Sequence, residues 1–283
     1  MSTRNNSPVL EPPPPIDLPA RPGDPVVIAL RFMLALAAIG LVVWSFIGLQ
    51  FDFTHFQTGV GAGVNYVGRM FPHKHADWNY DLDILKDLWA PFLTTVQMAV
   101  VGTVLGGILA FPASFLAART GSIPRPVSAL IKTYLNVSRA VPTIVYALIV
   151  VSAIGLGPSA GALAISFVTF VSLAKLWAES LESVAAGPIE AVRASGGNAA
   201  QVFVFGMLPQ VFPSYVSTSL YSLEFNLKDS FIVGIVGAGG LGFQLYNAIN
   251  LFKLLDAGVI IALLIILVNL VDYLSYRVRL VFT

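Results

Sequence analysis

Five polar side chains interrupt a long apolar segment late in the chain: Glu224, Asn226, Lys228, Asp229 and Ser230. Charged groups are costly at membrane depth, so we expect them to face a helix bundle or a wet cavity rather than lipid. Glu224 precedes Lys228 by four residues, the acid-first order that allows pairing along one helix face. Two interpretations stay open. The pair holds helices together, or the five residues line a passage in which Lys228 is a transient counter-charge for an anion.

A glycine-rich stretch, Gly237-Ala-Gly-Gly-Leu-Gly242, has the G-x-G-x-x-G spacing of dinucleotide-binding proteins. That interpretation requires a strand before the glycines and a βαβ unit around them. The preceding residues instead end an apolar segment, and no alternation of strands and helices is visible elsewhere. We therefore expect a tight, closely packed turn. The chain also lacks the G-x-x-x-x-G-K-[ST] sequence, so we expect no P-loop and no ATP site of its own.

The chain has few histidines and no cysteines that could take part in metal binding or catalysis. The three histidines, His55, His73 and His75, fall in one predicted loop, where the alternating pair offers two metal ligands at best. The chain has no cysteine, which excludes disulfides and thiolate chemistry. An intramembrane enzyme would need a nucleophile and a base at membrane depth, and this pattern supplies neither. We predict no catalytic residue and no metal site.

Composition favours a membrane protein. Hydrophobic residues make up 56% of the chain and charged residues 11%, too few charges to solvate the outside of a soluble core. Crossing ~30 Å of hydrocarbon takes about 20 apolar residues. Six segments qualify: Val26–Leu49, Pro91–Ala117, Val141–Gly157, Ala160–Trp177, Val211–Val236 and Leu254–Tyr276. The predicted fold is all-α, a polytopic membrane protein of about six transmembrane helices.

The distribution of basic residues predicts the orientation. Most of the 16 lysines and arginines flank the spans on the side of the N-terminus, which places both chain ends in the cytoplasm. Residues 1–25 are then a disordered, proline-rich cytoplasmic tail. Residues 26–49 form the first span, 50–90 an extracytoplasmic loop with an interfacial helix, and 91–283 the core. A polar, glycine-broken loop at about 179–210 faces the cytoplasm.

This cytoplasmic loop contains two predicted short helices. Pro188 suits the first position of a helix, and Gly196-Gly197 suits the end of that helix. The second helix is predicted over about 199–208 and ends at Pro209. Considered alone, the loop could be an ordinary connector or a docking surface for a partner protein.

The spacing in this loop resembles the EAA loop of bacterial ABC-importer permeases. The family pattern is Glu-Ala-Ala, three residues, Gly, nine residues, Ile, one residue, Leu-Pro. The matching positions are Glu190, Ala191, Gly196, Leu208 and Pro209, whereas Val192 and Gly206 depart from the pattern. The segments Arg139–Pro142 and Val236–Gly242 resemble the same importers, and Tyr221–Phe231 is most similar to the phosphonate-transport permeases.

The resemblance implies a type I ABC-importer permease core in the bacterial inner membrane. It implies that ATP is hydrolysed by a separate subunit, that this chain is not an enzyme, and that it binds no cofactor, since ATP and Mg²⁺ belong to that partner. The implied coupling residues are Glu190, Ala191, Arg193, Gly196, Gly197, Leu208 and Pro209.

The implied assembly is a homodimer in lipid with two ATP-binding subunits and an extracytoplasmic binding protein, without nucleic acid. The implied substrate is a phosphonate or a related small oxyanion. Alternatives are a permease for phosphate, phosphite, methionine or another amino acid, and an ion-coupled secondary transporter that uses Glu224 and Asp229 as its relay.

Overall fold

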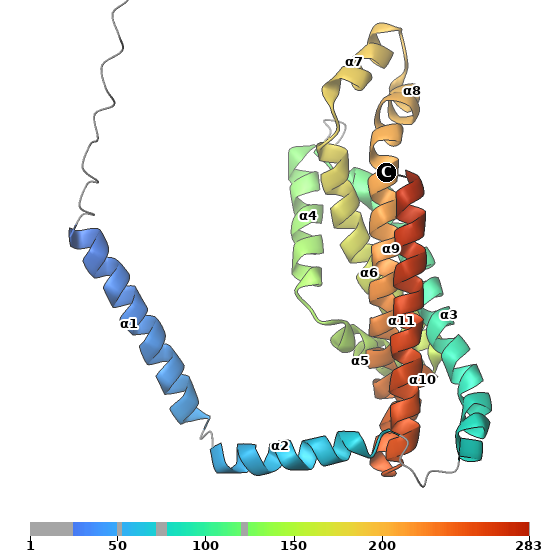
Figure 1. Ribbon diagram of the computed structural model, residues 1–283. Helices are drawn as coiled ribbons and strands as arrows, with labels where there is room; N and C mark the ends of the chain where they lie inside the picture. Colours follow the sequence, from blue (N-terminus) through green and yellow to red (C-terminus); the bar gives the residue numbers. More distant parts are fainter. Residues whose placement is uncertain (1–24, 50–52, 72–77, 120–123, 283) are drawn as a thin grey trace, which may run out of the picture. The chain divides into compact units, whose positions relative to one another are not determined.

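The computed structural model describes residues 25–49, 53–71, 78–119 and 124–282 (Figure 1). The predicted proline-rich tail lies outside this range, as do the side chains of His55, His73 and His75. The chain divides into two compact units, Met1–Ala62 and Gly63–Thr283. The described residues are helical and contain no strand, which confirms the all-α prediction and removes the βαβ setting that a dinucleotide site needs.

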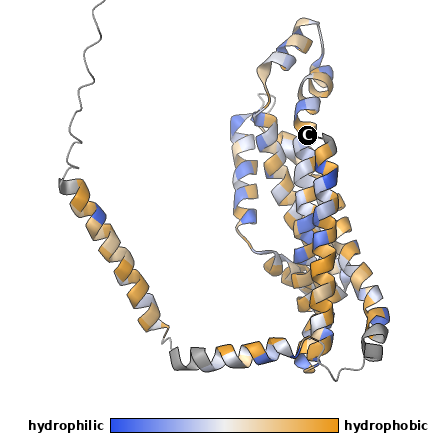
Figure 2. Cartoon of the chain, viewed as in Figure 1, coloured by the Kyte–Doolittle hydropathy of each residue, from blue (hydrophilic) through white to orange (hydrophobic). Residues whose placement is uncertain are grey.

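The first unit contains α1, Pro25–Gly48, which matches the predicted first span. Figure 2 shows this helix hydrophobic over most of its length, as a lipid-facing span requires. The next helix, α2, covers Phe53–Gly68 and contains the boundary between the two units.

The second unit is a helix bundle. Its elements are α3 (Trp78–Ala117), α4 (Arg125–Arg139), α5 (Thr143–Ile154), α6 (Pro158–Glu182), α7 (Ala186–Ala194), α8 (Ala199–Gln201), η1 (Val202–Met207), α9 (Leu208–Val233), η2 (Gly234–Ala238), α10 (Gly240–Asn250) and α11 (Leu254–Phe282). Five helical segments of the described chain are long and apolar enough to cross a membrane, and the bent pair α4–α5 makes a sixth. The predicted number of about six spans is therefore confirmed.

The predicted start of the second span at about Pro91 is wrong, because the apolar helical segment begins at Ile84. Helix α3 runs through 40 residues with Pro91 and Pro112 inside it. A proline removes one helical hydrogen bond, but packing can offset that loss. Leu88, one turn before Pro91, is buried in a cluster with Leu241 and Leu245 of α10, which stabilises the helix on both sides of the proline.

The predicted third span, Val141–Gly157, is also wrong. Helix α5 has only 12 residues, and it continues α4 across a 90° bend. Pro142 lies at this break, and a proline disfavours helical geometry at the residue before it. Figure 2 shows hydrophilic residues along α4, which explains why the sequence placed this segment outside the membrane.

The fourth span is longer than predicted and forms the centre of the bundle. Helix α6 buries one residue of nearly every turn, including Ile165 and Leu173. Small residues of α3 allow close contact, because a Cβ at Gly102 would overlap Ile165 and one at Gly106 would overlap Thr169. The interface of α3 with α6 is thus a close helix contact that depends on these glycines.

The glycine-rich stretch forms the predicted turn. Gly237 and Gly239 have φ values of +106° and +87°, which L-residues rarely adopt. The chain then enters α10, a helix that the sequence did not predict. Gly242 packs so closely on the backbone of Phe231 that a Cβ could not be accommodated.

Candidate functional site

The loop between α6 and α9 projects beyond the ends of the neighbouring helices (Figure 1). It consists of α7, α8 and η1, and α7 contains no buried residue. Glu190, Ala191 and Arg193 are exposed on α7. The structure therefore presents the three as a protruding surface that makes few contacts with the bundle.

The end of α7 follows the predicted glycine cap. Gly196 has a φ of +83°, and the amide of Gly197 donates to the carbonyl of Val192 at 3.0 Å. This is the long hydrogen bond of a Schellman motif, which reverses the chain after a helix. A Cβ at Gly197 would overlap Val192, so both glycines are needed for this turn.

The predicted end of the second helix at Pro209 is wrong. The short helix α8 continues through η1 into α9, and Pro209 occupies the first turn of α9, where a missing amide hydrogen costs little. The π-helical hydrogen bonds of Val202–Met207 absorb the change of register. Leu208 begins α9 directly after them.

Gly206 and Gln210 connect this region to α7. Gly206 is buried, and a Cβ there would lie 3.3 Å from the Cα of Ile189. The Gln210 amide donates to the carbonyl of Gly206 at 2.6 Å, and its oxygen accepts from the amide of Ala185 at 3.1 Å. No local sequence pattern indicates the role of Gln210, because its partner lies 25 residues away. Together the two residues hold the start of α7 to the start of α9.

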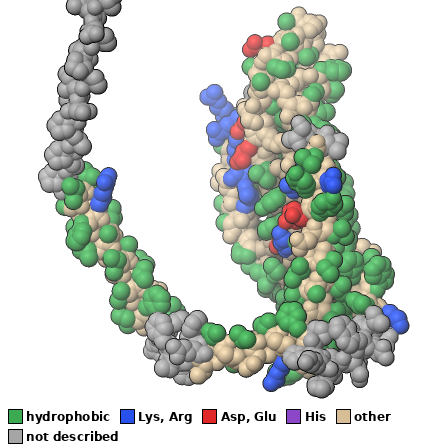
Figure 3. Space-filling view, viewed as in Figure 1, with side chains coloured by type: hydrophobic (Ala, Val, Ile, Leu, Met, Phe, Trp, Pro, Cys, Tyr) green, Lys and Arg blue, Asp and Glu red, His purple; other side chains and the backbone are tan. Residues whose placement is uncertain are grey.

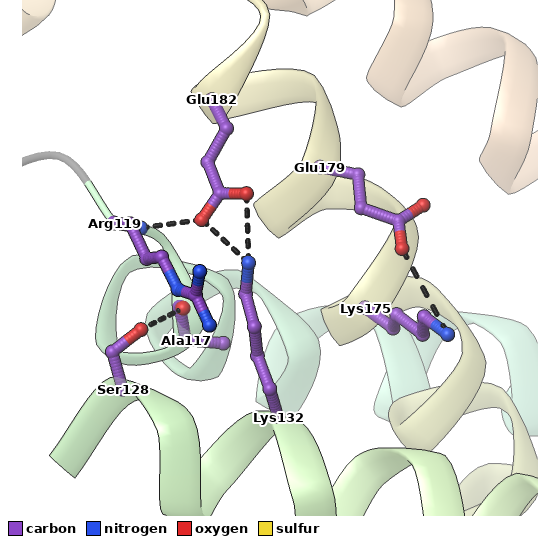
Figure 4. Close-up of polar contacts among 7 residues, drawn as sticks. All are labelled: Ala117, Arg119, Ser128, Lys132, Lys175, Glu179 and Glu182. Atoms are coloured by element: carbon purple, nitrogen blue, oxygen red, sulfur yellow. Dashed lines mark hydrogen bonds and ion pairs between the residues drawn. The ribbon is translucent and has the colours of Figure 1, made fainter. Parts of the chain in front are cut away.

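A charged cluster lies at the base of the loop (Figure 4). Glu182, the last residue of α6, accepts hydrogen bonds from Lys132 of α4 at 2.6 and 2.7 Å, and from the backbone amide of Arg119 at 2.5 Å. Ser128 donates to the carbonyl of Ala117, which joins α4 to the end of α3. Three helix ends are thereby fixed to one another. We call Arg119, Lys132 and Glu182 the loop-base cluster.

A cavity of about 770 Å³ separates α7 from this cluster. Arg193, Ile189 and Phe203 line it from the loop, while Arg119 and Glu182 line it from the bundle. The loop is therefore anchored at its two ends rather than along its length.

The polar residues of α9 divide into two sets. Asn226 donates to Thr103 of α3 and Thr169 of α6, each at 2.8 Å, and Asp229 accepts from Thr143 of α5 at 2.6 Å. These groups are buried among the helices.

The other three of the five predicted pathway residues, Glu224, Lys228 and Ser230, form hydrogen bonds only within α9. Ser230 is buried as well and donates to the carbonyl of Leu227. The predicted pair forms, with Lys228 Nζ at 2.8 Å from Glu224 Oε1. The Lys228 side chain is 50% exposed and the Glu224 side chain is 17% exposed, so this pair is only partly buried.

The geometry defines a class: a helical protein with several helices long and apolar enough to cross a membrane, and with a loop that projects from the bundle between α6 and α9. Comparison with known proteins agrees with this class. A model of the binding-protein-dependent transport system inner membrane component family matches residues 110–278. The chain belongs to this family and is the permease subunit of an ABC importer. This family membership excludes the alternative interpretation as an ion-coupled secondary transporter.

Two of the relatives are oxyanion permeases by name. HtxC of Stutzerimonas stutzeri, which carries the name of a phosphite transport system permease protein, is 32% identical over 249 residues, 88% of this chain and 86% of HtxC. The phosphate-import permease protein PhnE of Mycolicibacterium smegmatis is 35% identical over 88% of this chain but only 46% of its own length. The inward-facing MetNI methionine ABC transporter has the same fold, with a TM-score of 0.61 and 24% identity over 68% of this chain and 94% of that one.

Proposed function

We propose that this chain forms a homodimeric pore that imports a phosphonate or a related small oxyanion. Two ATP-binding subunits would drive it and bind ATP and Mg²⁺, and an extracytoplasmic binding protein would deliver the substrate. The substrate class rests on the names of HtxC and PhnE, relatives that this chain matches over 88% of its length. The binding protein would supply most of the selectivity, so the pore itself needs only weak contacts with its substrate.

The projecting loop is the observation that carries the proposal. An exposed helix joined to the bundle at its ends can enter a groove of a partner and transmit its movement to α6 and α9. Glu190, Ala191 and Arg193 would contact the ATP-binding subunit. The turn at Gly196 and Gly197, together with the helix start at Leu208-Pro209, would hold α7 at the required angle.

The proposed orientation places this loop, the N-terminus and the C-terminus in the cytoplasm. The C-terminal end of α11 lies at the same end of the second unit as α7 (Figure 1). The positive-inside rule supports the same side, since Arg119, Arg125 and Lys132 cluster near the loop.

Helix α9 would form a wall of the translocation path. Asn226 and Asp229 would fix its position through their hydrogen bonds to α3, α5 and α6, and Ser230 would lie beside them in the same wall. Glu224 and Lys228 neutralise each other, and we propose that this pair orients α9 at the edge of the path.

Uptake by a purified complex tests the proposal. The permease, its ATP-binding subunit and its binding protein would be reconstituted in proteoliposomes with ATP inside, and offered radiolabelled phosphonate, phosphite, phosphate or methionine. We expect ATP-dependent, binding-protein-dependent uptake of at least one oxyanion and none of methionine. Uptake of methionine alone would refute the substrate class, and uptake without ATP would refute the mechanism.

A further inference from the structure

We propose that Arg139 and the hydroxyl groups around it form an oxyanion contact site within the membrane-embedded part of the permease. The inference rests on the proposed function and adds a position at which the pore itself recognises its substrate. It concerns the bend between α4 and α5, not the loop that faces the ATP-binding subunit.

A cavity of about 230 Å³ lies beside Arg139. Arg139 contributes from the end of α4, Ser172 from α6, and Tyr221 and Ser222 from α9. The remaining lining consists of Asn226 and three apolar side chains, Val168, Leu176 and Phe225. The liquid volume of one water is about 30 Å³, so this cavity has room for a small tetrahedral ion. It brings one cation and three hydroxyl groups from three helices to one place.

Three of the donor groups in this cavity have no partner within the described chain, whereas the Asn226 amide is already bonded to Thr103 and Thr169. The Arg139 guanidinium forms no hydrogen bond or ion pair with any residue that the structure describes, and neither do the hydroxyls of Ser172 and Ser222. Two lysines of the bundle differ, because Lys132 and Lys228 pair with carboxylates at 2.6 and 2.8 Å, respectively. The hydrogen-bond donors of the Arg139 guanidinium are therefore available to a ligand.

The position of Arg139 favours a functional role. It is the last residue of α4, directly before the 90° bend of a broken span. Ionisable residues within membrane segments are costly and mark substrate paths, and broken helices line such paths in other transporters. A basic face is visible along α4 in the space-filling view (Figure 3).

The chemistry fits an oxyanion. A guanidinium stays charged and offers a planar set of donors that matches two oxygens of a phosphate-like group. Hydroxyls on α6 and α9 can donate to the remaining oxygens. A single unpaired cation attracts an anion but makes fewer contacts than a tight binding site. Weak binding of this kind suits a substrate that must leave the site again and continue through the pore.

The test compares Arg139→Gln, Arg139→Lys and the matched control Arg125→Gln at the other end of α4. Each complex would be assayed for phosphite and phosphonate uptake in proteoliposomes, normalised to assembled complex, and for stimulation of ATPase activity by liganded binding protein. We expect Arg139→Gln to keep assembly and stimulated ATPase activity but to lose at least tenfold in uptake. Arg139→Lys should retain part of the uptake and Arg125→Gln most of it.

Two outcomes would overturn the inference. The first is wild-type uptake by Arg139→Gln, and the second is an equal loss of assembly in Arg139→Gln and Arg139→Lys, which indicates a structural role. If Arg139→Gln fails to assemble while Arg139→Lys assembles, the double variant Ser172→Ala, Ser222→Ala decides, because it removes two donors with little change in volume. Its uptake should fall several-fold, and unchanged uptake refutes the site. Failure of the wild-type complex to import any oxyanion would instead refute the proposed function, and this inference with it.

Discussion

At the scale of single residues, Gly196 is the position where loop shape depends most directly on backbone conformation. Its φ of +83° lies in the left-handed region, and no atom lies within 4 Å of a Cβ built there. A substitution is therefore penalised by backbone strain and not by collision, at about 1–2 kcal/mol for a non-glycine residue.

Gly196→Val should insert into the membrane normally but lose most uptake, because α7 would no longer be held at its angle. Asparagine tolerates positive φ, so Gly196→Asn should retain uptake and is the matched control. The measurement is uptake and co-purification of the ATP-binding subunit. Full uptake in a well-expressed Gly196→Val protein would show that the turn does not serve coupling.

The pair of Glu224 and Lys228 is the other residue-scale test. Lys228→Ala leaves a partly buried carboxylate without its partner, and we expect a lower melting temperature, equivalent to a few kcal/mol at most. The double variant Glu224→Gln, Lys228→Met should recover both stability and uptake, since the pair is already neutral as a unit. Normal assembly with poor uptake in the double variant would place Lys228 in the substrate path.

At the scale of elements, contacts near in sequence were predictable and distant ones were not. The Glu224–Lys228 pair follows from helical spacing, and the glycine cap of α7 follows from the residue types that reverse a chain. The bond of Glu182 to Lys132 joins residues 50 positions apart, and no local pattern indicates it. Pro142 in the sequence indicates a helix break at this position. The charged residues of α4, however, favoured a segment outside the membrane, so the broken span was not predicted.

The loop-base cluster should contribute to stability as an element contact. Lys132→Ala removes two hydrogen bonds from the half-buried Glu182, and we expect a loss on the order of 1 kcal/mol, seen as a lower melting temperature in detergent. Lys175→Ala is the control, because its pair with Glu179 spans 3.8 Å with Glu179 53% exposed. Equal effects of the two variants would contradict the assigned role of the cluster.

At the scale of the whole molecule, fold class and span number followed from composition and segment length. Helix boundaries did not, because buried contacts such as those of Leu88 decide whether a helix continues past a proline. Family membership rests on the comparisons, whereas the sidedness of the membrane rests on the distribution of charge.

Sidedness can be measured because the chain has no cysteine of its own. Single cysteines at Ser7, Gly121 and Ser195 should be protected from an impermeant thiol reagent in intact cells and should react after permeabilisation. Cysteines at Gly59 and Ala76 should react in intact cells. Labelling of Ser195→Cys without permeabilisation would reverse the proposed orientation.

The measurement that tests the central claim most directly is a photo-cross-link from α7 to the ATP-binding subunit. A photoreactive amino acid at Glu190, on the projecting loop, would be compared with one at Asn250, the exposed last residue of α10. In the assembled complex we predict an adduct with the ATP-binding subunit from position 190 and none from position 250. An intact complex with no adduct from position 190, or with equal adducts from both positions, would contradict the account.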